Sequence, residues 1–108
     1  MGHFGVQMIA RLWHGWTSPE NADKYHNLLQ SRILPEIHRV NGYKGAWLLR
    51  RDAGPEIEFI TITFWESWDA IREFAGPSQT HGVVPEEARK LLSRFDEESV
   101  HYDGTWVP

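Results

Sequence analysis

The stretch Glu56–Trp65, which reads EIEFITITFW, decides the fold class of this chain. Every second residue from Ile57 to Trp65 is apolar or threonine, and Ile60, Ile62 and Phe64 between them are apolar as well. A strand that is apolar on both sides is typical of the buried middle of a sheet. The sequence therefore predicts a central strand in a sheet that is covered on both faces.

Three further strands are predicted around this one. A strand over 43–51 is joined to it by a turn at 52–55, which contains Gly and Pro. A last strand covers 99–104. The first strand covers 6–16, and its side chains alternate between two faces. One face carries Met8, Ala10, Leu12, His14 and Trp16, and the other carries Ile9, Arg11 and Trp13.

Helices are expected between the strands. Residues 17–20 combine a hydroxyl cap, an early proline and an acid, which favours a helix start. Pro35 is expected to break or kink this first helix. A second helix begins after Ser67 and is interrupted at 76–78, and Pro85 opens a third segment. The apolar stripe of the first helix is Ala22, Tyr25, Leu28, Leu29 and Ile33, and that of the third is Val84, Ala88, Leu91, Leu92 and Phe95.

The order β-α-β-β-α-β predicts one α+β domain of ferredoxin-like topology over residues 1–108, with an antiparallel sheet. Residues 1–7 are either part of the native start or an extension ahead of Met8. Right-handed crossovers place both helical layers on one face of the sheet. The other face is apolar too, so we expect a homodimer in which a second copy covers it. The alternative is a monomer with a solvated sheet face.

Composition excludes several classes of partner. The net charge is −4 and the basic residues are scattered, which argues against nucleic acid. No apolar run approaches the roughly 20 residues that a membrane span needs, and the N-terminus has no signal-peptide pattern. The chain has no cysteine, which excludes disulfides and thiolate chemistry. A cytoplasmic protein is expected.

His14 and His81 are the candidate catalytic residues. His14 lies on a strand among aromatic neighbours, and His81 lies in the irregular stretch 77–82, where a pocket mouth is expected. An imidazole that titrates near neutral pH can act as acid, base or axial ligand. The alternatives are a hydrogen-bonded strand histidine and a solvated loop histidine. No histidine pair has metal-ligand spacing, so no metal site is predicted, and no serine-nucleophile, phosphate or dinucleotide motif occurs.

Aromatic side chains are expected to wall a pocket for a planar ligand on the helix side of the sheet, near 76–82. Arg11 lies on the opposite strand face to His14. It is expected to form a buried ion pair with a carboxylate at the subunit interface, and the alternative is an anionic substrate. The predicted substrate-binding residues are Leu12, Trp47, Trp65, Trp68 and Phe74.

Several segments resemble the antibiotic biosynthesis monooxygenase-like family. They are the strand 8–13, the strand from Phe59 that runs into Trp65-Glu66-Ser67, Phe74-Ala75-Gly76, the segment 83–96 and His101-Tyr102. The resemblance covers residues 8–103. It implies a dimeric α/β barrel of ferredoxin-like subunits, each with a pocket between sheet and helices. Members of the family include cofactor-independent oxygenases of phenols, haem-degrading oxygenases and isomerases of small signalling molecules.

The leading hypothesis is a cofactor-independent monooxygenase-like enzyme for a small aromatic or quinone-like molecule, which His14 or His81 deprotonates or orients. The second is a haem-binding or haem-degrading oxygenase with His81 as axial ligand. The haem-degrading branch has an Asn on the first strand, which this chain lacks, and Phe74 stands where that branch has a Trp. The third is a non-enzymatic dimeric small-molecule binder.

Overall fold

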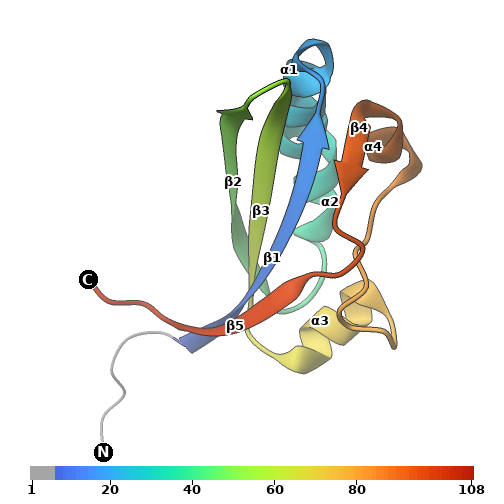
Figure 1. Cartoon of the computed structure of the whole chain (residues 1–108). Coiled ribbons are helices and arrows are strands. Elements are labelled where there is room, and N and C mark those ends of the chain that lie inside the picture. The colour runs from blue at the N-terminus through green and yellow to red at the C-terminus, as the bar shows by residue number, and fades with distance from the viewer. Residues whose placement is uncertain (1–6) are drawn as a thin grey trace, which may run out of the picture.

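The computed structural model describes residues 7–108 and contains one antiparallel sheet with helices packed on one side (Figure 1). Residues 1–6, on which the choice between Met1 and an extension ahead of Met8 depends, lie outside the described range. The strands are β1 (Gln7–Thr17), β2 (Tyr43–Ala53), β3 (Glu56–Trp65), β4 (Leu92–Phe95) and β5 (Val100–Thr105). The helices are α1 (Pro19–Leu28), the π turn η1 (Leu29–Ile33), α2 (Leu34–Ile37), α3 (Trp68–Ala75) and α4 (Glu86–Leu91).

The ferredoxin-like α+β fold predicted from the sequence is confirmed. The strand order is β2-β3-β1, and β1 also pairs with both β4 and β5 on its other edge. β3 therefore has a partner on each side, as expected of the central strand Glu56–Trp65. The hairpin between β2 and β3 closes at Gly54 and Pro55, because Ala53 pairs with Glu56.

The edge of the sheet formed by β4 and β5 differs from the prediction. β5 pairs with the first half of β1, and the short β4 pairs with its end, so that residues 96–99 leave the sheet between them. The third helix was predicted to extend to Phe95, but α4 ends at Leu91. Leu92 instead pairs with Thr17 of β1. The prediction failed because this pairing with a distant strand outweighs the helical spacing of Leu91, Leu92 and Phe95.

Pro35 does not end the first helix. The chain remains helical from Pro19 to Ile37, and the turn Leu29–Ile33 just ahead of the proline is wider than an α-turn. The backbone N–H of Leu34 donates to the carbonyl of Leu29, five residues back. A π turn is a common way to absorb a local disturbance in a helix, and here it accommodates a residue without an N–H.

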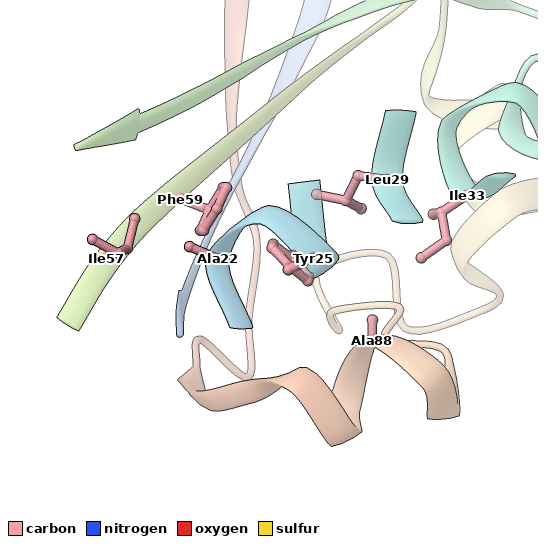
Figure 2. Close-up of a cluster of buried hydrophobic side chains, with 7 residues drawn as sticks. All are labelled: Ala22, Tyr25, Leu29, Ile33, Ile57, Phe59 and Ala88. Atoms are coloured by element: carbon pink, nitrogen blue, oxygen red, sulfur yellow. The ribbon is translucent and has the colours of Figure 1, made fainter. Parts of the chain in front are cut away.

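The core lies between β3 and the helices (Figure 2). The predicted stripe of the first helix supplies Tyr25 and Leu29, which pack with Phe59 of β3 and Ala88 of α4. A second cluster, formed by Ile9, Trp65, Ala70 and Ile71, fixes α3 at the other end of the sheet. The predicted cap is also present, since the Ser67 hydroxyl accepts from the backbone N–H of Ala70 at 3.1 Å. Among the helices of residues 7–108, none has the length and apolar character to cross a membrane.

Candidate functional site

A cavity lies between the sheet and the helices, on the side where it was predicted. Its volume is about 70 Å³. A shallower hollow of about 270 Å³ adjoins it, since Ile33, Ile37, Phe74, Val83 and Pro85 line both. The inner cavity is lined by Arg11, Trp13, Tyr25, Leu29, Ile33, Leu34, Ile37, Thr61, Thr63, Phe74, Val83, Val84, Pro85, Ala88 and Ser99.

The volume limits what can bind. A cavity of roughly 150 Å³ is known to hold benzene, and about 10–15 Å³ is enough for one water. The inner cavity of about 70 Å³ therefore has room for a few waters but not for a whole ring. An aromatic ligand has to occupy the inner cavity and the adjoining hollow together, with its ring near the shared side chain of Phe74.

Three aromatic side chains form most of the rigid wall. The Trp13 indole N–H donates to the carbonyl of Asp96 at 2.6 Å, which fixes the ring of this β1 residue. The Phe74 ring stacks on Trp65 with 5.2 Å between centroids. Tyr25 meets Phe59 edge-on at 4.8 Å. Rings held in this way present flat apolar surface without further ordering, which suits a planar ligand.

Arg11 is the charged group of the cavity and is 4% exposed. Its Nη1 donates to the carbonyl of Gln79 and lies 3.0 Å from Nε2 of His101. Its Nη2 donates to the carbonyl of His81 at 2.8 Å. The guanidinium carbon lies 5.7 Å from the centre of the Phe74 ring. Arg11 therefore ties the loop after α3 to the sheet and carries a positive charge against the aromatic wall.

Arg11 forms no ion pair with another described residue of its own chain. Among residues 7–108, no carboxylate oxygen lies within 4.0 Å of its guanidinium. Burial lowers the pKa of Arg11 to about 10, and the more distant charge of Glu98 opposes this shift. Arg11 is thus still a cation at neutral pH. The pair with a carboxylate across a subunit interface stays a prediction, and within the described residues two loop carbonyls, which no sequence pattern reveals, accept from the guanidinium.

Hydroxyl groups complete the polar lining, which includes Tyr25, Ser99, Thr61 and Thr63. Burial raises the pKa of Tyr25, so its hydroxyl stays protonated and remains a hydrogen-bond donor. Ser99 is 4% exposed, and its Oγ has no hydrogen-bond partner among the described residues. The cavity therefore combines one cation with hydroxyl donors on an otherwise apolar surface.

The predicted substrate-binding residues are not all brought together. Phe74 lines the cavity, and Trp65 lies directly behind it with its indole N–H bonded to Oγ1 of Thr63 at 2.8 Å. Trp68 is the first residue of α3 and is 40% exposed. The centre of its ring lies 4.8 Å from the centre of the His101 ring. Leu12 and Trp47 both pair with Ile62 of β3, so their side chains lie on the sheet face that the helices do not cover.

Neither candidate catalytic histidine lines the cavity. The ring of His81 is exposed and lies 3.7 Å from a carboxylate oxygen of Glu98. His14 is on the sheet face without helices, where Nδ1 lies 2.9 Å from Asp96 and Nε2 lies 3.5 Å from Glu58. The His14 ring also stacks on Trp16. The catalytic roles expected for the two histidines stay predictions.

Known structures with the same architecture were found by comparison of the whole fold. No family model and no curated protein matches the chain. A Bacillus cereus protein named as an antibiotic biosynthesis monooxygenase is 12% identical, with 95% of this chain and 96% of that chain covered and a TM-score of 0.64. A Bordetella bronchiseptica protein of the same name is 24% identical, with 95% and 100% covered and a TM-score of 0.54. The chain has the fold of the antibiotic biosynthesis monooxygenases.

A third structure with this monooxygenase fold holds a ligand. It is a monooxygenase of Streptomyces coelicolor in complex with nanaomycin D, 18% identical, with 95% of this chain and 89% of that chain covered and a TM-score of 0.57. At these identities the likeness shows a shared fold, and chemistry has to be argued from the residues of the cavity.

The residues of the cavity do not fit haem. No histidine of residues 7–108 lines the inner cavity or the adjoining hollow, and the ring of His81 lies 3.7 Å from Glu98 instead. The inner cavity of about 70 Å³ is also much smaller than a porphyrin. For metal ions, no group of three or more acidic or histidine side chains arranged to hold one is found within residues 7–108.

Sequence reasoning missed Tyr25 and Ser99 as site residues. Tyr25 was assigned to the buried stripe of the first helix, where its ring does lie. Its hydroxyl was the available signal, because a buried tyrosine normally directs its polar end to a partner or a cavity. Ser99 has no comparable signal, because its position depends on where β5 begins.

Proposed function

We propose that this chain is a cofactor-independent monooxygenase-like enzyme that acts on a small aromatic or quinone-like molecule bound between the sheet and the helices. One observation carries the proposal, namely that a cavity with the rings of Trp13, Tyr25 and Phe74 in its wall also contains a buried cation, Arg11. The names of the structures that share the fold support it, and one of them is a monooxygenase with an organic ligand bound.

The reaction needs no outside reductant if the substrate is a phenol. The phenolate supplies electrons from its ring, a ring carbon bonds to O₂, and the resulting hydroperoxide loses water to leave a quinone. One oxygen atom enters the ring as a carbonyl and the other leaves as water, which takes the two hydrogens lost from the O–H and C–H bonds. Phenol and O₂ thus balance quinone and water.

The cavity residues match the negative charges that form during this reaction. A phenolate and a peroxide are anions, and the Arg11 guanidinium stabilises negative charge strongly where water is excluded. The protonated hydroxyl of Tyr25 is a donor for the phenolate oxygen. The flat walls at Trp13 and Phe74 hold the ring. In this proposal Arg11 and Tyr25 orient the substrate, a role that the sequence suggested for His14 or His81, and they bind it as the phenolate without acting as its base.

We also propose that the working form is a homodimer that packs through the sheet face without helices. This face carries exposed apolar side chains, among them Trp47 at 65%, Leu49 at 43% and Tyr102 at 54%. Ile60, Ile62 and Phe64 of β3 lie between them on the same face. A contiguous apolar surface of this kind marks an interaction site, and a second copy offers a matching sheet face by symmetry.

Oxygen uptake tests the enzymatic proposal. Protein treated with a chelator is mixed with phenols, naphthols and anthrones, and O₂ is followed with an electrode. We expect consumption above the rate without protein for at least one compound, and loss of that consumption in Val84→Phe, which fills the cavity. Lys90→Phe adds the same ring on an exposed position of α4 and is the control. Equal rates in Val84→Phe and wild type, or no uptake with any compound, would contradict the proposal.

A further inference from the structure

Arg11 and Ser99 line the same cavity and bind neighbouring carbonyls of the loop after α3. Arg11 donates to the carbonyl of Gln79, and the backbone N–H of Ser99, the residue just before β5, donates to the carbonyl of Thr80 at 2.6 Å. Both residues line the cavity and both are 4% exposed.

The hydrogen bonds of Arg11 within the described residues do not use Nε. A guanidinium has five N–H donors in a fixed plane. The contacts described above involve Nη1 twice and Nη2 once, and Nε has no partner among residues 7–108. In a guanidinium, the N–H of Nε and one N–H of Nη2 point to the same side, and this edge can bind the two oxygens of a carboxylate.

No carboxylate of residues 7–108 is in contact with the charge of Arg11, and Glu98 acts on it only from a distance. The three contacts of Arg11 are two backbone carbonyls and the imidazole of His101, whose pKa is lowered by burial and by Arg11 itself. The carboxylate of Glu98 bonds to Thr80 at 2.6 Å and lies near His81 instead. A buried cation without an anion in contact is unfavourable, and a bound carboxylate would offset part of that cost.

Ser99 supplies an independent indication of a ligand. Its Oγ is buried and makes no hydrogen bond within the described part of the chain. A buried hydroxyl without a partner is unfavourable, and a bound acceptor would recover that cost. A residue with a free guanidinium N–H, Arg11, and a residue with an unpartnered hydroxyl, Ser99, thus line the same cavity.

We propose that the aromatic ligand carries a carboxylate, which binds to Arg11 and Ser99 while its ring lies against Phe74. This inference rests on the proposed function for the place where the ring binds, and it adds the class of substrate, an aromatic carboxylic acid. The Arg11 guanidinium lies 5.7 Å from the centre of the Phe74 ring, so the acid group and the aromatic ring of one small molecule can reach both residues.

Calorimetric titration with a matched pair of probes tests this inference. The probes are 4-hydroxybenzoate and its methyl ester, which differ in the charge of one group. At pH 7.5 we expect wild type to bind the acid at least tenfold more tightly than the ester. We expect Arg11→Met to abolish that preference, Arg11→Lys to keep part of it, and Ser99→Ala to weaken acid binding several-fold without affecting the ester.

The control variant is Arg50→Met, which removes an arginine that lies over the Phe59 ring at 5.2 Å but does not line the cavity. It should leave the preference unchanged. Far-ultraviolet circular dichroism establishes that each variant is folded, and Ser99→Ala keeps the inference testable if Arg11→Met does not fold. Equal affinities for acid and ester in wild type, or no binding of either, would overturn the inference.

The outcome is separable from that of the proposed function. If the acid binds through Arg11 but no phenol causes O₂ uptake, the inference stands and the oxygenase proposal fails. If phenols cause O₂ uptake that Val84→Phe abolishes and acid and ester bind equally, the oxygenase proposal stands and the inference fails.

Discussion

Gly82→Ala should disturb the cavity wall through Trp13. A Cβ at Gly82 would lie 2.7 Å from Nε1 of Trp13 and 3.3 Å from the carbonyls of Asp96 and Glu97. The backbone cannot retreat easily, because the N–H of Gly82 donates to the carbonyl of Glu97 at 2.8 Å. The indole must therefore move, and its hydrogen bond to Asp96 is lost.

The expected loss of stability follows from these two contacts. Overpacking a well-filled site costs typically about 1–3 kcal/mol. The lost indole hydrogen bond adds about 1 kcal/mol, which gives about 2–4 kcal/mol in all. In a domain of this size one kcal/mol corresponds to a shift in Tm of roughly 4–8 °C, so a fall of at least about 8 °C is expected.

Thermal unfolding followed by circular dichroism measures this change. The control is Gly104→Ala, where the added Cβ meets only the carbonyl of Met8, at 3.3 Å. It should change Tm much less. A Gly82→Ala protein that melts within about 2 °C of wild type would refute the reasoning, because that shift corresponds to well under 1 kcal/mol.

Three further predictions concern the interface, the histidines and pH. Ile62→Glu on the open sheet face should convert a dimer into a 12.6 kDa monomer in sedimentation equilibrium, and a wild type that is already monomeric would contradict the dimer. The double variant of His14→Ala and His81→Ala should keep its turnover, because neither ring lines the cavity, and a large loss of kcat would restore their catalytic roles. The pKa of His101 is lowered in the folded state, so the unfolded chain binds more protons below pH 6.5 and Tm should fall as the pH decreases through this region. His101→Gln should make Tm depend less on pH. If Tm falls equally in the variant and in wild type between pH 7.5 and 5.5, His101 is not the group responsible.

Much of the fold could be predicted because its strands are long and strongly patterned. Glu56–Trp65 was predicted with the bounds that the structure has, and the cap at Ser67 followed from the residue type alone. The short β4 could not be predicted in the same way. Leu92–Phe95 has a helical spacing, and only the pairing with the end of β1 makes it a strand.

The candidate site was predicted in position but only partly in composition. The cavity lies on the helix side beside Phe74, as expected from the break after the second helix. Alternation on β1 already placed Arg11 and His14 on opposite faces, so the signal against His14 as a cavity residue was in the sequence. His14 was predicted as catalytic because an imidazole can act as acid or base, but the cavity lies on the face of β1 that carries Arg11. The loop carbonyls that hold Arg11 could not be predicted, because backbone atoms carry no sequence signature.

The location of the bound ring tests the central claim most directly. The chain has six tryptophans, and their indole N–H groups can be followed separately in ¹⁵N–¹H spectra during titration with an aromatic ligand that raises the Tm. The account predicts that the signal of Trp13 in the cavity wall shifts most, while that of Trp47 on the open sheet face stays in place. A shift at Trp47 without one at Trp13 would contradict it.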